Sequence, residues 1–269
     1  MDMKMLNVAC GGRYHDDWIN IDFHSDSSKV RQANLLEGLP FDDGLMDGVY
    51  SSHFLEHLSI SDGENIVGEM YRVLKEKGVV RIVVPDLENV CREYLTVLDG
   101  IGDSDNIRKY EWITVELLDQ LTRDVAGGYM QRMFDKVTNE KDMYLVDYIS
   151  HRTGESLLKE NTACKHKRTV TFNKVKNRIL YLYLHCIQLL IPKNIRKSMI
   201  VKTNIGEKHK WMYDKYSLSK LLQEAGFNNI LVKTFNTSQI NSFNSFNLDC
   251  NSDGTPYKGI HSLYIEATK

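Results

Sequence analysis

The 269-residue sequence lacks most of the features that would assign it to a specialised class of protein. Its five cysteines include no C-x-x-C pair, and its first residues lack the apolar stretch of a secretory signal peptide. Its longest apolar run, 179–191, is shorter than the roughly 18 residues that a membrane-spanning helix needs. Its net charge of −2 provides no overall attraction to nucleic acid or to anionic membranes. These absences predict a reduced, cytoplasmic protein.

The dinucleotide fingerprint G-x-G-x-x-G is also absent, although a glycine turn follows the first predicted strand. Residues 6–10 predict a short strand, Gly11 and Gly12 a turn, and residues 18–23 a second strand that ends near Asp22. Such a turn lets the backbone approach a ligand closely. An acid at the end of the next strand is placed to accept both hydroxyls of a ribose. The pattern predicts a nucleoside cofactor and argues against a nicotinamide or a flavin.

The connection between these two strands is unusually short. Parallel neighbours normally need a crossover of a dozen residues or more, usually a helix. Only residues 11–17 lie between the strands, and fully extended they reach on the order of 23 Å. We therefore expect the first crossover helix to be absent or reduced to one turn. The later insertion or a partner subunit would then cover that part of the sheet.

Five segments resemble, in this order, the class I S-adenosylmethionine (SAM)-dependent methyltransferases, in particular a bacterial branch associated with polysaccharide biosynthesis. They are LNVACGG with WINID, NLLEGLPF, DGVYSSHFLEHL, EMYRVLKEKGVVRIVVPD and YSLSKLLQEAGF. The resemblance implies an α/β Rossmann-like fold, with a mostly parallel seven-stranded sheet, an antiparallel last strand and a helical insertion after strand 5. Residues 1–86 and 209–269 would form the SAM-binding domain, and residues 87–208 the helical cap.

The resemblance also implies SAM as the cofactor. Asp22 would bind the ribose, the backbone of Ala9 to Gly12 would lie against the methionyl part, and Arg13 is a candidate partner for its carboxylate. Ala9 stands where the family has its first glycine, so a positive φ there would strain the turn. Asn34 would contact the adenine, although a turn residue is an equally good interpretation of Asn34 alone. The residues expected to bind the cofactor are Ala9, Cys10, Gly11, Gly12, Arg13, Asp22, Phe23, Asn34, Leu35 and Ser52.

Polar side chains follow the predicted fourth strand, residues 47–54, where the strand order is expected to reverse. A neutral imidazole titrates near working pH, so it can take a proton from an acceptor hydroxyl or amine. His57 is the first candidate base and His53 the second. For each, a structural role or substrate positioning is the alternative, and Glu56 with His57 could simply stabilise a turn. No group of residues has the spacing of a metal site, so we predict no metal dependence.

Residues 61–77 predict a helix that opens with a capping box of Ser61 and Glu64. The β-branched run 79–84 that follows is typical of a central strand buried on both faces.

The predicted insertion contains a helix at 110–124, on which Asp119 and Arg123 are expected to form an exposed ion pair. Residues 165–202 carry ten Lys or Arg and no acid, with apolar side chains between the basic flanks. Such a stretch can pack in the cap with its lysines solvated, meet a membrane or a lipid-linked substrate, or bind nucleic acid. The third reading is the least favoured.

Three residues beyond the insertion, His209, Trp211 and Tyr213, are expected to border the substrate cavity. The resemblance implies O-methylation of a sugar or glycan, either free or lipid-linked, by a protein that is cytoplasmic or peripheral at the inner face of the membrane. One alternative is a non-catalytic SAM-fold protein that acts as a scaffold. The other is a methyltransferase acting on RNA or a small metabolite. A homo-oligomer is compatible with either function.

Overall fold

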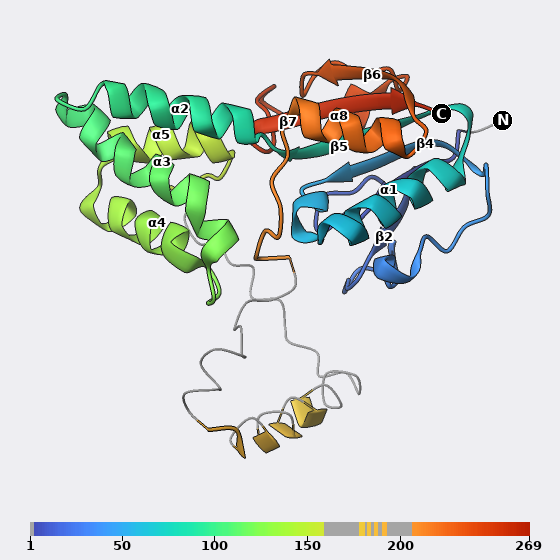
Figure 1. Cartoon of the computed structure of the whole chain (residues 1–269), viewed down its shortest axis with the longest axis horizontal. Coiled ribbons are helices and arrows are strands. Elements are labelled where there is room, and N and C mark those ends of the chain that lie inside the picture. Colours follow the sequence, from blue (N-terminus) through green and yellow to red (C-terminus); the bar gives the residue numbers. More distant parts are fainter. Residues whose placement is uncertain (1–2, 159–177, 181, 184–185, 188–189, 193–205) are drawn as a thin grey trace.

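The computed structural model describes residues 3–158, 178–180, 182–183, 186–187, 190–192 and 206–269. A seven-stranded sheet runs through the structure in the order β3-β2-β1-β4-β5-β7-β6 (Figure 1). Strands β1 to β5 pair in parallel, and β7 is antiparallel to both of its neighbours. The predicted Rossmann-like methyltransferase fold is confirmed. The strands are β1 (Met5–Val8), β2 (Ile19–Asp22), β3 (Val30–Gln32), β4 (Met46–Ser52), β5 (Leu74–Pro85), β6 (Asn228–Lys233) and β7 (Ser262–Thr268).

Two helices, α1 (Ile60–Val73) and α8 (Lys215–Glu224), cover one face of the sheet (Figure 1). The apolar side chains that they bury, such as Val67 and Leu222, belong to the same core as the strand residues beneath them. This face therefore has the helix-on-sheet packing that the alternation of elements predicts.

The limits of α1 differ from the predicted helix 61–77. The helix starts after Ser59, whose hydroxyl accepts the N–H of Asp62, so the predicted capping box is wrong. It ends before Leu74, which is fully buried and pairs with Met46 of β4. The chain therefore passes from helix to strand without a loop.

The opposite face has no helix between β1 and β2, as predicted. Residues 9–18 form turns, and Trp18 packs edge-on against Phe243 at 6.1 Å and Phe246 at 5.4 Å, measured between ring centroids. Both phenylalanines belong to the short 3-10 helix η3 (Phe243–Phe246). The C-terminal segment 235–250 therefore covers this face. The expectation that the inserted helices or a partner would do so is wrong.

A buried charge fastens the covering segment to the sheet. Arg81 interrupts the β-branched run 79–84 in β5, and it is fully buried. Its guanidinium forms ion pairs with Asp249 at 2.7 Å and Glu266 at 2.8 Å, and it donates to the carbonyls of Thr234 and Thr237. Removing either acid would leave charge buried without its full set of partners, so these contacts specify the position of the segment closely.

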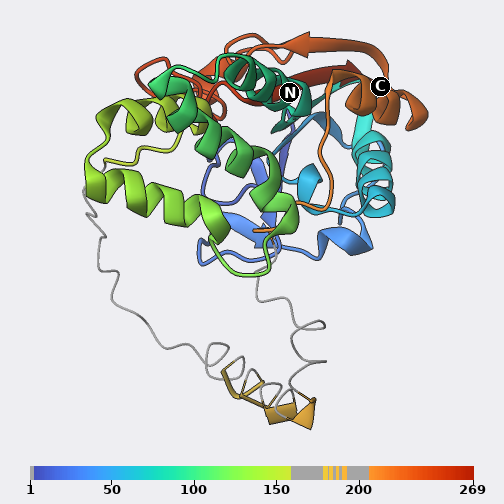
Figure 2. The same ribbon diagram turned by 60° about the vertical axis from the view of Figure 1, so that its left-hand side comes forward.

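Four helices follow β5 and form a group beside the sheet (Figures 1 and 2). The ion pair between Asp119 of α3 and Arg123, the residue that caps the end of this helix, was expected to be exposed, but both side chains are buried and lie 2.6 Å apart. The reason is that Asp119 also accepts the N–H of Tyr129 in the first turn of α4. The helices are α2 (Leu87–Asp99), α3 (Ser104–Thr122), α4 (Gly128–Glu140) and α5 (Met143–Thr153).

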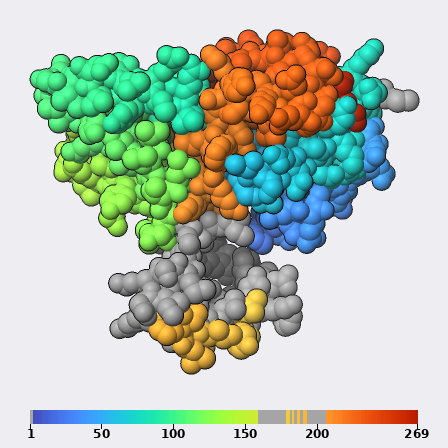
Figure 3. Space-filling view, in the orientation of Figure 1, coloured from blue at the N-terminus to red at the C-terminus, as the bar shows by residue number. Residues whose placement is uncertain are grey.

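The segment 206–214 runs between these helices and α1 before it enters α8, and Figure 3 shows it in orange between the two groups. Most of the basic stretch 165–202 lies outside the described residues, so its role stays a prediction. Among the residues that are described, no helix is long and apolar enough to cross a membrane.

We predict that Phe243→Ala lowers the free energy of unfolding by about 3–5 kcal/mol, because Phe243 is buried against Trp18 where a crossover helix is missing. Tyr216→Ala removes an aromatic side chain that is 75% exposed, and it should change stability by less than about 0.5 kcal/mol. Urea titration followed by tryptophan fluorescence measures both. Equal stabilities of the two variants would contradict this account of the cover.

Candidate active site

Two neighbouring strands end in a left-handed residue at the point where the strand order reverses. Ala9 follows β1 with a φ of 55°, and His53 follows β4 with a φ of 50°. This backbone region is uncommon for residues other than glycine, and such outliers cluster at functional sites. The sequence analysis predicted strain in the turn if Ala9 had a positive φ, and the structure shows that it does. These bends turn the chain away from the sheet at its carboxyl edge, where open α/β sheets bind ligands.

Asp22, at the end of β2, lies beside the glycine turn. Its Oδ2 accepts the N–H of Gly11 at 2.8 Å, and its Oδ1 accepts the N–H of His24 at 3.2 Å. Asp22 is half-buried, so its carboxylate still borders solvent. The structure therefore brings the acid and the turn together as the sequence indicated, with the carboxylate oriented by two backbone groups.

A cavity of about 160 Å³ lies against this turn. Side chains added at Gly11 or Gly12 would meet no atom within 4 Å, so the turn leaves open space for a ligand. Six of the ten predicted cofactor residues line it. His53, predicted as a candidate base, also lines it, whereas Asn7, Tyr50, Tyr257 and Lys258 were not predicted as site residues. The lining residues are Asn7, Ala9, Cys10, Gly11, Gly12, Arg13, Tyr50, Ser52, His53, Tyr257 and Lys258.

Four predicted cofactor residues do not line this cavity. One of them is Asp22, which lies beside the turn as described above, and the other three are held by other contacts. Asn34 accepts the N–H of Leu36 and so caps a short 3-10 helix, which is the turn role considered for it. Leu35 is buried in the main core, and Phe23 packs against Phe54 at 6.2 Å between ring centroids.

Arg13 lines the cavity, but its guanidinium is engaged by the C-terminal loop. It donates to the carbonyl of Cys250 and lies over the ring of Tyr257, 4.3 Å from the ring centroid. If Arg13 also bound the carboxylate of the cofactor, that contact would add to these contacts or replace them.

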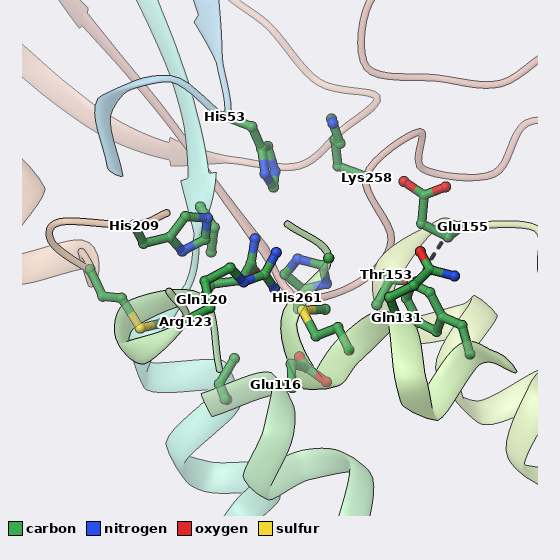
Figure 4. Close-up of a pocket in the computed structure, with 16 residues that line it drawn as sticks. His53, Glu116, Gln120, Arg123, Gln131, Thr153, Glu155, His209, Lys258 and His261 are labelled. Atoms are coloured by element: carbon green, nitrogen blue, oxygen red, sulfur yellow. Dashed lines mark hydrogen bonds between the residues drawn. The ribbon is translucent and has the colours of Figure 1, made fainter. Parts of the chain in front are cut away.

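A second cavity, of about 260 Å³, lies between the end of β5, the inserted helices and the segment 206–214. Figure 4 shows His53 and Lys258 on one side of it and Arg123 and Gln120 on the other. Both His53 and Lys258 line the first cavity as well. His53 therefore stands between the two cavities.

The three predicted substrate residues are placed differently. His209 lines the second cavity and is nearly fully buried. Tyr213 lies in the main core, and Trp211 is 44% exposed. Gln120 and Arg123, from the inserted helical region, also line the second cavity.

Next to the second cavity, Glu56 and His57 lie in the 3-10 helix η2 (Leu55–His57) directly after β4. Glu56 is fully buried, and burial raises its pKa to about 8. Burial lowers the pKa of His57, lowers that of His53 well below its ordinary value, and lowers that of His209 to about 3. At neutral pH these imidazoles are therefore uncharged, and each carries a lone pair.

The hydrogen bonds of two of these histidines define which nitrogen carries the lone pair. His57 Nδ1 donates to the carbonyl of Lys208 at 3.1 Å, so the lone pair is on Nε2. Ser262 donates its hydroxyl proton to the backbone carbonyl of Lys258 and accepts from His53 Nε2 at 3.0 Å. The lone pair of His53 is then on Nδ1, 3.4 Å from Glu56 Oε1.

Residues 6–82 match the model of a methyltransferase domain, a region that contains the glycine turn, Asp22 and the Glu56 cluster. The strand order and the antiparallel β7 agree with that match. This part of the chain therefore resembles a methyltransferase domain. No curated protein matches the sequence.

The chain is also similar to solved structures, at low identity. A SAM-dependent methyltransferase from Archaeoglobus fulgidus is 14% identical, with 99% of this chain and 86% of that chain covered and a TM-score of 0.41. A SAM-dependent methyltransferase from Methanosarcina mazei is 12% identical, with 100% and 93% covered and a TM-score of 0.41. These scores are too low to support any statement about substrate.

The residues at the glycine turn fit SAM as a cofactor. The open turn at Gly11 and Gly12 leaves the close approach that a nucleoside needs, and Asp22 provides an acceptor at the end of β2. Burial, with Asp22 nearby, raises the pKa of Cys10 to about 12, so this thiol stays protonated and does not compete as a nucleophile.

We predict that Ala9→Gly raises the free energy of unfolding by up to about 1 kcal/mol, because glycine adopts the φ of 55° without the Cβ penalty. The same substitution at Ala225, whose φ is −77°, should lower stability by roughly 0.5 kcal/mol. Thermal unfolding followed by circular dichroism distinguishes them. Destabilisation by Ala9→Gly comparable to that by Ala225→Gly would contradict the assigned strain.

Proposed function

We propose that the protein transfers the methyl group of SAM to a hydroxyl oxygen of a sugar or glycan. The observation that carries the proposal is the position of His53, which lines both the cavity at the glycine turn and the cavity beneath the inserted helices. An acceptor in the second cavity would meet a methyl donor in the first at this side chain.

Polar residues around the second cavity support a polyhydroxylated acceptor. Gln120, Gln131 and Glu155 offer hydrogen bonds to hydroxyl groups, and Arg123 and Lys258 add positive charge. The charged lysine would also suit an acceptor that carries a phosphate, such as a nucleotide-linked or lipid-linked sugar.

His53 is our candidate for the base, ahead of His57, because it lines both cavities. SAM, when bound, would supply a methyl group on a positively charged sulfur, and transfer of that methyl carbon to the acceptor oxygen would leave the bonding electron pair on sulfur. The protein's part is to orient the hydroxyl and to receive its proton at the imidazole. We place Asp22 on the ribose of the cofactor.

A non-catalytic scaffold is the second candidate, favoured by the strained Ala9 and by the missing first crossover helix. Calorimetry separates the two, because absence of SAM binding at millimolar concentration would favour the scaffold. The division into a SAM-binding domain, 1–86 with 209–269, and a cap, 87–208, belongs to the enzymatic proposal. A cytoplasmic location of the protein is also part of the enzymatic proposal.

We predict that Asp22→Ala weakens SAM binding at least tenfold, about 1.4 kcal/mol or more, because a hydrogen bond to a charged group is lost. Asp42→Ala, an exposed acid outside the turn, is the matched control and should bind like wild type. Isothermal titration calorimetry measures both affinities. Unchanged affinity in Asp22→Ala would remove the ribose assignment.

We predict that His53→Gln slows methyl transfer at least 100-fold, in the range expected for loss of a general base, and that this loss is much larger than any loss of SAM affinity. The assay uses SAM labelled with tritium in the methyl group and a panel of monosaccharides and their nucleoside diphosphate forms. Histamine and total tRNA test nitrogen and RNA acceptors in parallel. Label transferred only to an amine or to RNA would contradict the proposal.

A further inference from the structure

Three side chains from distant parts of the sequence meet beside the second cavity and provide the donor set of a metal site. One oxygen of Glu56 and one ring nitrogen each of His57 and His209 lie within 4.8 Å of one another. Two imidazoles and a carboxylate are a common ligand set for divalent transition metals. Among the residues that the structure describes, no other group of histidine, cysteine and acidic side chains has such a geometry.

Glu56 provides an independent indication of a ligand. Its side chain is completely buried, yet neither carboxylate oxygen has a hydrogen-bond partner among the described residues. Buried carboxylates in proteins are paired, hydrogen-bonded or bound to a metal. Its Oε1 faces the imidazole nitrogens instead, at 3.9 Å from His57 Nε2 and 3.4 Å from His53 Nδ1.

The surrounding hydrogen bonds orient these groups as metal ligands are usually oriented. His57 donates its other ring nitrogen to the backbone carbonyl of Lys208, the arrangement that directs the free nitrogen of a ligand toward a metal. The carbonyl of Glu56 accepts the N–H groups of Lys210 at 2.7 Å and Trp211 at 3.2 Å. These bonds hold the segment that carries His209 against η2.

The spacing is close to that of an ion-bound site. Ligand atoms at about 2.1 Å from a tetrahedral ion stand about 3.4 Å apart. The separation of 3.9 Å between Glu56 Oε1 and His57 Nε2 already approaches this value. Side-chain adjustments of about 1 Å would bring the three atoms, now within 4.8 Å, onto one ion.

We propose that Glu56, His57 and His209 bind one divalent transition-metal ion, such as Zn²⁺, Mn²⁺ or Co²⁺. Imidazole ligands disfavour Mg²⁺ and Ca²⁺, which prefer oxygen. His209 lines the second cavity, so the ion lies where an acceptor hydroxyl could reach it. The ion would bind the oxygen of the acceptor hydroxyl and lower the pKa of that hydroxyl, a role that rests on the proposed function.

The test uses the full-length chain, freed of any histidine tag and of metal by dialysis against a chelator. Titration with Co²⁺, followed by its visible absorption, and with Zn²⁺, followed by calorimetry, should show one ion per chain. Glu56→Gln, which keeps the size of the side chain, and His209→Ala should each weaken binding at least 100-fold. The exposed residues Glu64 and His151 provide the controls, and Glu64→Gln and His151→Ala should bind metal like wild type.

Binding of neither ion by wild type at 100 μM would overturn the site, as would equal affinities of wild type and Glu56→Gln. Circular dichroism shows whether each variant is folded, and the rise in wild-type melting temperature with added Zn²⁺ gives a measurement that needs no variant. SAM binding, measured separately on the metal-free protein, keeps the two proposals apart. Metal binding without SAM binding would leave the site and remove the methyl transfer, and the reverse result would remove only the site.

Discussion

The short connection between β1 and β2 is the constraint on which the rest of the structure depends. Residues 9–18 are too few to form a crossover helix and return to the sheet, so one face beside β1 and β4 needs another cover. The segment 235–250 supplies it, with Phe243 against Trp18 and Arg81 held by acids from the segment and from β7. The same segment leads on to Tyr257 and Lys258, which close the cavity at the glycine turn. The C-terminal segment thus covers the face that the short N-terminal connection leaves without a helix, and residues from both ends of the sequence form the site.

Polar and charged side chains are buried at several points of this arrangement, and the contacts that compensate them differ between the core and the site. Arg81 is surrounded by two carboxylates and two carbonyls, so its burial is fully compensated. Glu56 is as deeply buried without hydrogen-bond partners in the described chain, and the imidazoles around it are uncharged. Buried polar groups without hydrogen-bond partners destabilise a core, and they are found at binding and catalytic sites. The contrast separates the part of the buried polar network that holds the fold from the part that is available for chemistry.

Much of the fold could be predicted from the sequence because its signals are local. The β-branched run in β5, the glycine turn with Asp22, and the missing first helix all depend on a few adjacent residues. The cover of the second face could not be predicted, because the Asn- and Ser-rich segment 235–250 has no periodicity and packs through isolated aromatic residues. The limits of α1 were missed for a related reason: the pairing of Leu74 with Met46 ends the helix, and that contact is not visible in the helical pattern.

The candidate site divides in the same way. Ala9 to Arg13, Asp22 and Ser52 could be singled out because they follow strands whose ends meet at one edge of the sheet. The group of Glu56, His57 and His209 could not be recognised as a possible metal site, because spacing along the chain carries no information about ligands so far apart. The prediction of no metal dependence relied on that spacing. The position of His53 between two cavities, which ranks it above His57, likewise depends on packing of α3 and the C-terminal loop.

The most direct test of the central claim is a crystal structure of the protein with S-adenosylhomocysteine. The account predicts the nucleoside over the carboxyl ends of β1 and β2, its ribose hydroxyls on Asp22 and its sulfur toward His53. A nucleoside bound elsewhere, or a ribose that makes no contact with Asp22, would contradict it.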